Sequence, residues 1–172
     1  QTDQWKISIA TVPSPVVVGE DKIFLSGGYN AGCMMIRLKD ESGAIGVETV
    51  FRLDAKVFGS PQHTPILYEG YIYGVRPDGQ MTCLSAEGEI RWTSGAKNRF
   101  GLGPYLIADR KIFVADDSGL LSVAEAAPGG YVPLAQAKVL EGHDCWAPMA
   151  LVAGRLILRD LTQMICLDLT VK

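Results

Sequence analysis

Residues 64–94, TPILYEGYIYGVRPDGQMTCLSAEGEIRWTS, hold four short apolar runs separated by turns. Each run has the length of a strand. The runs contain Ile, Val, Tyr, Thr and Trp, residues that are enriched in strands. Glycine marks the turns between them, which leaves no segment long enough for an ordinary helix. The stretch therefore predicts an antiparallel meander. Its four expected strands are Pro65–Tyr68, Tyr71–Val75, Gln80–Ser85 and Glu89–Thr93.

The same pattern recurs along the whole chain. A Pro, an apolar run, a polar turn and a second apolar run begin at Ser14 (SPVVVGEDKIFLSGG), Gly103 (GPYLIADRKIFVADDSG) and Ala147 (APMALVAGRLILRD). The opening prolines, Pro15, Pro65, Pro104 and Pro148, are 50, 39 and 44 residues apart, a spacing typical of propeller blades. We predict an all-β protein, a β-propeller of four-stranded antiparallel blades with about four blades in this chain. The expected blades are residues 11–58, 59–98, 99–142 and 143–172.

The two ends of the chain complement each other. The last repeat stops after its third strand, Met164–Leu169, so its fourth strand is missing. Near the start, residues 4–8 (QWKIS) resemble the fourth strand of the second repeat, residues 90–94 (IRWTS). We therefore predict that residues 1–10 supply the fourth strand of a blade, with Trp5 packed between sheets, because propellers protect their strand edges.

Composition and charge exclude several classes of function. The chain has 172 residues, with 16 Lys and Arg against 19 Asp and Glu, a net charge of −3 and no basic run. A duplex-binding protein normally carries a basic excess, so no nucleic acid is expected as a partner. The longest uncharged stretches are short and interrupted by Pro, so no transmembrane segment is expected either. The chain starts at Gln1, which is expected of a processed or excised chain.

One repeat resembles a known family. The residues Ala86-Glu87-Gly88-Glu89-Ile90-Arg91-Trp92 follow a Pro, an apolar strand and a Gly turn, and this order resembles the repeat of pyrroloquinoline-quinone-type (PQQ-like) β-propellers. That superfamily includes quinoprotein alcohol dehydrogenases and the outer-membrane-assembly propeller lipoproteins of bacteria. Its members usually have seven or eight blades. The resemblance therefore implies about half a ring, the C-terminal half, in a periplasmic or secreted bacterial protein.

The resemblance leaves two functions open. The favoured one is a non-catalytic scaffold that binds a protein partner or a small ligand at the rim and needs no cofactor. The alternative is part of a quinoprotein oxidoreductase, which holds PQQ with calcium. The family's dehydrogenases commonly carry two adjacent cysteines, and this chain has no Cys-Cys pair. Asn30, Asp116 and Asp117 offer oxygen ligands for calcium but belong to different blades. No Ser-His-Asp motif or Gly-rich phosphate loop favours another enzyme class.

The cysteines are assigned to the structure of the blades. In the third strands of the repeats, Cys83 and Cys166 align with Val123 and Ile36, so both are expected to be small core residues. Cys33 and Cys145 have no second cysteine at metal-ligand spacing, so no metal site is expected.

The candidate binding residues lie on one rim. In a four-stranded blade, the turn between the second and third strands shares a face of the ring with the connection to the next blade. Most polar residues there are expected to be solvated turn residues. His63, Arg99, His143 and Trp146 lie in the longer connections and are less easily explained in this way, and ligands of propellers usually bind near the mouth of the channel. The predicted rim residues are His63, Arg76, Arg99, His143, Asp144, Trp146 and Arg159.

Four blades alone would leave two apolar sheet faces uncovered. Such faces are larger than the apolar patches that soluble monomers usually expose. The chain is therefore expected either to pair as a homodimer, which makes an eight-blade ring, or to need the remainder of a larger propeller chain.

Overall fold

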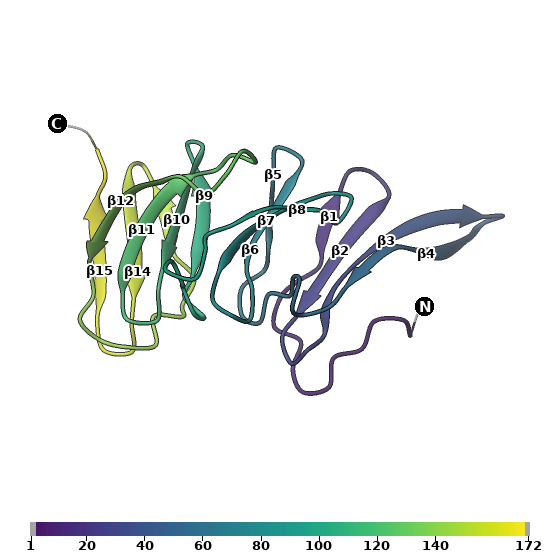
Figure 1. Cartoon of the computed structure of the whole chain (residues 1–172), viewed down its shortest axis with the longest axis horizontal. Coiled ribbons are helices and arrows are strands. Elements are labelled where there is room, and N and C mark those ends of the chain that lie inside the picture. The colour runs from purple at the N-terminus through teal and green to yellow at the C-terminus, as the bar shows by residue number, and fades with distance from the viewer. Residues whose placement is uncertain (1–2, 171–172) are drawn as a thin grey trace.

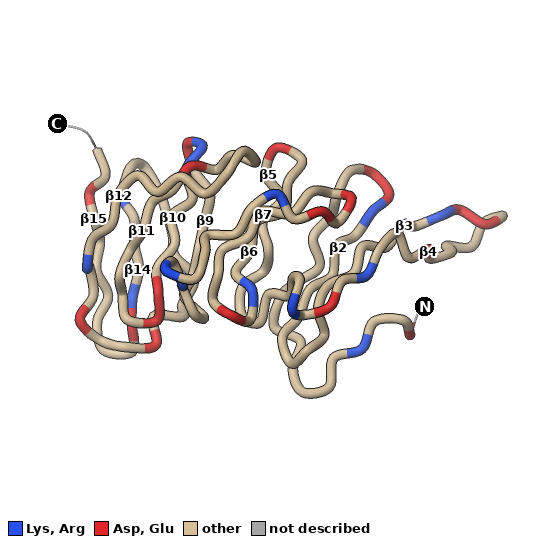
Figure 2. The backbone as a smooth tube through the Cα atoms, viewed as in Figure 1, with Lys and Arg blue, Asp and Glu red and all other residues tan. Residues whose placement is uncertain are grey.

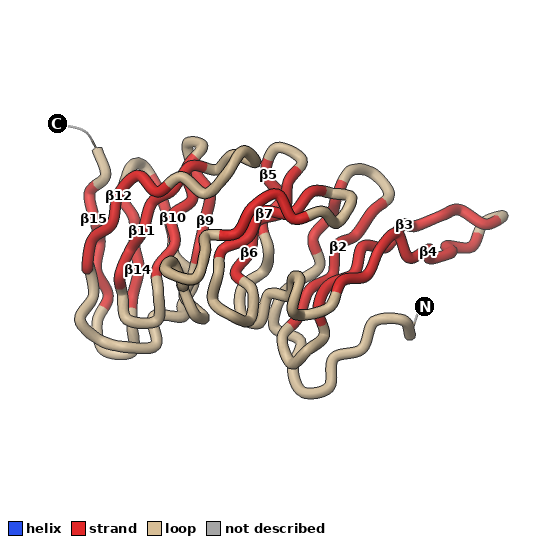
Figure 3. Tube along the Cα trace, viewed as in Figure 1, coloured by secondary structure: helices blue, strands red, loops and turns tan. Residues whose placement is uncertain are grey.

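A computed structural model describes residues 3–170 of the chain. Within that range every regular element is a strand, as Figure 3 shows, and no helix is present that could cross a membrane. The first sheet contains β1 (Val16–Val18), β2 (Lys22–Gly27), β3 (Gly32–Glu41) and β4 (Ala44–Leu53). The second contains β5 (Ile66–Tyr68), β6 (Tyr71–Val75), β7 (Met81–Ser85) and β8 (Ile90–Thr93). The third contains β9 (Tyr105–Ala108), β10 (Lys111–Ala115), β11 (Leu120–Glu125) and β12 (Pro133–Lys138), and the fourth contains β13 (Ala150–Val152), β14 (Arg155–Arg159) and β15 (Met164–Asp168).

Each sheet is an antiparallel meander in chain order, with four strands in the first three sheets and three in the last. The sheets stand face to face in a row from one end of the molecule to the other (Figure 1). This is an all-β fold of the β-propeller type with four blades, as the repeat predicts. Glycines make the turns possible: Gly79 has φ +83° and Gly119 has φ +87°, a conformation that other residues rarely adopt.

The row of sheets is open. β1 contacts β5 and β5 contacts β9, which places the first strands of the first three blades along one side. Among residues 3–170, no strand of the first sheet contacts a strand of the last. The first and last sheets lie at opposite ends of the row in Figure 1. Each end sheet therefore has one face that no other sheet of the described residues covers.

Apolar side chains fill the gaps between neighbouring sheets. Phe24 and Ile72 pack between the first and second sheets, and Tyr73 packs between the second and third. Phe113 and Leu156 fill the gap between the third and fourth. Adjacent residues such as Ile72 and Tyr73 thus face opposite sheets, because side chains alternate along a strand. Burial of each large apolar side chain contributes about 2 kcal/mol, so these interfaces hold the row together.

The N-terminal segment, predicted as the fourth strand of a blade, pairs with no sheet of residues 3–170, and its first two residues lie outside the described part of the chain. Residues 3–10 form no strand and lie against the outer face and edge of the first sheet. The backbone oxygen of Gln4 accepts a hydrogen bond from Arg52 at 2.8 Å, and its side chain accepts one from Thr49. A Cβ on Gly27 would meet the Ile7 side chain at 2.6 Å, so Ile7 packs closely there. The three-stranded sheet that lacks a fourth strand is at the far end of the row, out of reach of this segment (Figure 1).

The cysteines follow their positions in the row. Cys33, Cys83 and Cys145 are buried between sheets, as expected. Cys166 is exposed, so the prediction that it is a core residue is wrong for this chain. The physical reason is that Cys166 lies on the outer face of the last sheet, where no further blade covers it.

Candidate functional site

The rim is built from four turns and three long connections. The turns join β2 to β3, β6 to β7, β10 to β11 and β14 to β15, and the connections run between consecutive sheets. Figure 2 shows Lys and Arg interspersed with Asp and Glu along the backbone from the first sheet to the last. Most of the acidic side chains on the rim have defined hydrogen-bond partners, and these partners determine which residues remain available to a ligand.

Three aspartates in the rim turns accept hydrogen bonds from the backbone; Asp116 and Asp160 directly follow the second strand of their blade, and Asp78 lies two residues further along its turn. Asp78 accepts a hydrogen bond from the N–H of Gln80, Asp116 accepts one from Leu120, and Asp160 accepts one from Gln163 at 2.8 Å. The backbone N–H of Thr162 donates to Asp160 as well and, with the other donors, lowers the pKa of this buried carboxyl below its ordinary range. These aspartates are turn residues, as expected for most of the rim.

Arg76 pairs with Asp78 within the same turn. The Nε of Arg76 donates to Asp78 at 3.1 Å, and a second guanidinium nitrogen forms an ion pair with the same carboxylate. This side-chain hydrogen bond is the main reason why the pKa of Asp78 falls to about 2. Both residues line a cleft of about 430 Å³ between the first and second blades. Its other lining residues are Asn30, Ala55, Lys56 and Pro77.

His63 is part of the packing between blades. Its Nε2 lies 3.1 Å from the backbone oxygen of Leu102, and its ring meets that of Tyr105 edge-on with centroids 5.7 Å apart. Burial lowers the pKa of His63, so the imidazole is neutral at pH 7. Neutral His63 holds the connection after the second sheet to the connection after the first, rather than facing open solvent.

Asp117 joins several rim segments. One carboxylate oxygen accepts the backbone N–H of Leu102 and the indole N–H of Trp146, both at 2.8 Å. The backbone oxygen of Asp117 accepts the N–H of Cys145 at 3.2 Å. These contacts fix the orientation of Trp146, whose surface is 38% exposed. The rim therefore presents an oriented aromatic side chain beside a charged loop.

The remaining predicted residues are more exposed. The side chain of His143 is 74% exposed and its Nδ1 lies 2.9 Å from the carboxylate of Asp144. Arg99 is exposed, and its backbone bridges to Gln80. Arg159 is also exposed and lies at the end of β14 on the last sheet.

The structure thus divides the predicted residues into groups. His63 is linked through Leu102 and Asp117 to Trp146, and His143 and Asp144 directly precede that tryptophan. Arg76 belongs to the separate cleft beside Asn30 and Lys56, and Arg159 stands on the last sheet. Asp117 is the functional candidate that the list of rim residues lacks. The sequence signal for it is the pair Asp116-Asp117. Asp116 alone accepts the backbone N–H groups of the turn, so the carboxylate of Asp117 is available for other contacts.

The residues do not fit a calcium site for PQQ. The carboxylate of Asp116 accepts three hydrogen bonds from its own turn, and Asp117 accepts those of Leu102 and Trp146. Asn30 lines the separate cleft between the first two blades. Residues 3–170 contain no group of three or more His, Cys, Asp or Glu side chains arranged to hold a metal ion.

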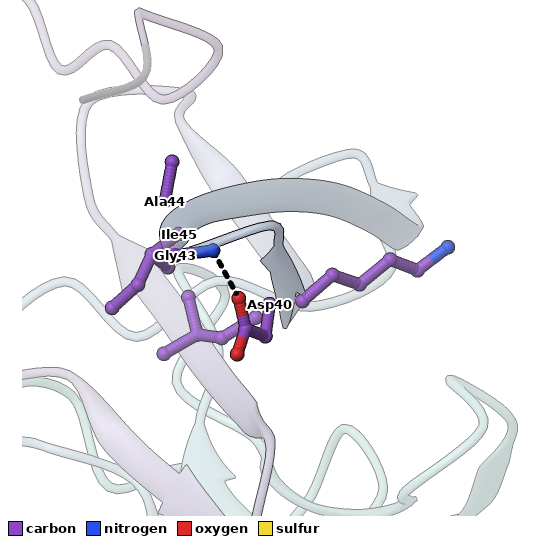
Figure 4. A pocket seen from close by; sticks show the side chains of 6 residues that line it. Asp40, Gly43, Ala44 and Ile45 are labelled. Atoms are coloured by element: carbon purple, nitrogen blue, oxygen red, sulfur yellow. Dashed lines mark hydrogen bonds between the residues drawn. The ribbon is translucent and has the colours of Figure 1, made fainter.

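A further pocket, of about 330 Å³, lies at the tip of the β3–β4 hairpin, which projects from the row (Figure 1). Here Asp40 accepts a hydrogen bond from the N–H of Gly43 at 2.9 Å (Figure 4). The carboxylate stabilises the turn of the hairpin, and the remaining lining residues are Leu38, Lys39, Ala44 and Ile45. The pocket has no converging set of polar groups of the kind that orients a ligand.

Comparisons with known proteins support the fold. No protein-family model matches the chain, and no curated protein matches it in sequence. Among solved structures, BamB from Moraxella catarrhalis is similar at 14% identity and a TM-score of 0.63, over 90% of this chain and 41% of BamB. Apo AztD from Citrobacter koseri is similar at 13% identity and a TM-score of 0.56, over 88% of this chain and 43% of AztD.

A computationally designed protein, Ika4, is similar at 7% identity and a TM-score of 0.59, over 99% of this chain and 100% of Ika4. The chain spans less than half the length of BamB and of AztD, and the full length of Ika4. At these identities the likeness shows the fold alone. The resemblance to PQQ-like repeats rests on the residues of the second repeat.

Proposed function

We propose that the chain is a non-catalytic β-propeller scaffold that binds a protein partner through its rim, in the bacterial cell envelope. The observation that carries the proposal is the oriented and exposed Trp146, held by Asp117 next to the exposed His143. Tryptophan and arginine are enriched among the residues that dominate binding energy at protein interfaces. A side chain that is already fixed loses less entropy on binding.

The same rim offers charged groups around this aromatic residue. Arg99 is exposed and lies in the connection whose Leu102 is bound by Asp117. The cleft beside Arg76 and Lys56 adds a second place for polar groups of a partner or for a small ligand. Placement in the envelope is supported by the resemblance of the second repeat to PQQ-like propellers of bacteria.

The alternative function is that of a segment of a PQQ-dependent oxidoreductase. The hydrogen bonds of Asp116 and Asp117 argue against a calcium site in this segment. The two functions are separated by adding PQQ and calcium to the purified chain and following the absorbance of the quinone. A saturable spectral change would favour the oxidoreductase.

The scaffold proposal is tested by site-specific photocrosslinking in cells. A photoreactive amino acid replaces His143 on the rim, and the matched control carries it at Asp109, on the opposite rim, whose side chain is 82% exposed. We expect a discrete adduct from position 143 and none from position 109, in the envelope fraction. Adding W146A should reduce that adduct several-fold. Equal adducts at both positions, or none at 143, would contradict the proposal.

A further inference from the structure

The outer face of the last sheet repeats a pattern that is buried inside the row. Tyr73 and Phe113 each face the following sheet and are covered by it. The equivalent residue of the last sheet is Ile157, because it pairs with Cys166 as Tyr73 pairs with Cys83. Within the described part of the chain no sheet follows Ile157. The last sheet therefore presents the face that the inner sheets bury.

The middle of this outer face is apolar, with the charged residues Arg155, Arg159 and Asp168 toward its ends, and its strand edge is unpaired. Val152 is 64% exposed and Met164 is 70% exposed. β15 pairs with β14 on one side, and no strand of residues 3–170 pairs with it on the other. An exposed strand edge beside an apolar face is a template for a further strand.

The first sheet carries the complementary face. The side chains of Ile72 and Ile112 face the preceding sheet and are fully buried against it. Phe24 faces the second sheet, so its neighbour Ile23 lies on the outer face of the first sheet. In the row, faces of these two kinds meet between every pair of consecutive sheets. The outer faces of the first and last sheets are therefore suited to each other.

The N-terminal segment lies against the outer face of the first sheet, the side on which a preceding blade would stand. Trp92 in β8 contacts the blade that follows it, donating to the backbone of Ala127 and packing 5.7 Å from the ring of Tyr131. Trp5 also contacts the blade that follows it, near the end of the outer strand β4, with the Arg52 guanidinium 5.8 Å from its ring centroid. Each tryptophan thus lies against the outer part of the next blade.

We propose that a second copy of this chain supplies that preceding blade: two copies close into one ring of eight blades, and residues 3–8 of each add as the fourth strand to β15 of the other. In the second sheet Trp92 stands opposite Cys83. The equivalent pairing places Trp5 of one copy opposite Cys166 of the other. A single chain cannot make this pairing, because the segment and β15 lie at opposite ends of the row (Figure 1).

A two-fold arrangement forms both contacts at once. Each copy offers one first sheet, one last sheet and one N-terminal segment, so a closed pair leaves no end sheet uncovered. Val152, Met164 and Cys166 then become buried. The other occupant that would fit these faces is a further part of a longer chain, which the experiment distinguishes.

The proposal is tested with the 172-residue chain. We expect light scattering to give twice 18.6 kDa at micromolar concentration. Trp5→Cys should form a disulfide with Cys166 of the second copy under mild oxidation, seen as a covalent dimer on a non-reducing gel. Adding C166S should abolish the covalent dimer. Lys6→Cys, whose side chain points to the other side of the strand, is the matched control and should form little.

A second measurement does not depend on the substituted tryptophan. In the unmodified chain, labelling of Cys166 should be at least about tenfold slower than in a variant lacking residues 1–8, because the added strand covers the thiol. A monomer with rapid Cys166 labelling would overturn the proposal and favour a longer chain as the occupant. A dimer in which W5C gives no crosslink would overturn the strand exchange.

Discussion

The indole N–H of Trp146 donates to the carboxylate of Asp117 across the gap between the third and fourth blades, and the same oxygen accepts the backbone N–H of Leu102. One oxygen atom thus joins the turn between β10 and β11 to the connections on both sides of the third blade. The exposed tryptophan of the rim is held by a contact that also fixes the neighbouring loops.

Replacing this aspartate should loosen the rim. Asp117→Ala removes the acceptor of both donors, and we expect a loss of about 1–2 kcal/mol in the free energy of unfolding, because hydrogen bonds to a charged group are among the stronger ones. Asp117→Asn keeps one oxygen and should lose less. Urea unfolding measures the difference. Asp109→Ala, at an exposed turn, is the control, and a loss from D117A no larger than from D109A would contradict the account.

Two buried tyrosines should respond in opposite directions to removal of the hydroxyl. Among residues 3–170 the buried hydroxyl of Tyr73 has no nitrogen or oxygen partner and faces only the weakly polar thiol of Cys83, so Tyr73→Phe should leave stability unchanged or raise it by about 1 kcal/mol. The hydroxyl of Tyr105 lies 3.3 Å from the backbone oxygens of His63 and Thr64. Tyr105→Phe should therefore lower stability by about 1 kcal/mol. Equal losses in the two variants by urea unfolding would count against the packing described for Tyr73.

The turn aspartates predict acid sensitivity. The pKa of Asp160 is lowered in the folded chain, and that of Asp78 is lowered to about 2. Since an unfolded aspartate titrates near pH ~4, each carboxylate stabilises the fold fully above that pH, and the stabilisation is lost as the pH falls toward the folded value. Asp160→Asn should therefore be less stable than the original chain at pH 7 and approach it below about pH 3. Stability curves that stay parallel down to about pH 2 would contradict this.

The buried thiols should be unreactive. Burial raises the pKa of Cys33 to about 12 and those of Cys83 and Cys145 to about 11. Little thiolate then forms at pH 8, and access is blocked as well. In a Cys166→Ser variant, the three remaining thiols should react with a thiol reagent over hours when folded and at once in urea. Rapid reaction of the folded variant would show that the gaps between sheets open readily.

The second blade was predictable almost residue by residue. The strands expected from its Gly-bearing turns agree with β5, β6, β7 and β8 to within one residue at each end. The first blade was less predictable. Phe24 pairs with Met35, eleven residues further on, whereas Tyr73 of the second blade pairs with Cys83, ten residues further on. The β2–β3 turn is thus one residue longer, and Met35, not Ile36, faces the following sheet as Cys83 does. A repeat alignment that ignores the extra turn residue assigns the wrong face by one residue.

The contacts between rim segments could not be predicted from the sequence. Alternation along β15 correctly places Cys166 on one face, yet whether a face is covered depends on what stands next to it. Asp117 binds Leu102 and Trp146 from two separate connections, and no spacing in the chain encodes such a meeting. Local turn chemistry could be inferred from Asp and Gly positions, whereas contacts between blades required the arrangement of the sheets.

The openness of the row is tested by the distance between its two end sheets within one chain. Spin labels at Val17→Cys and Val152→Cys, in a C166S chain diluted with unlabelled protein, report that distance by pulsed electron resonance. Both positions are exposed on outer faces. Because packed sheets lie about 10 Å apart, the account predicts a separation of about 30 Å or more. A single narrow distance near about 10 Å would show that the four blades close on themselves, and would contradict the open row.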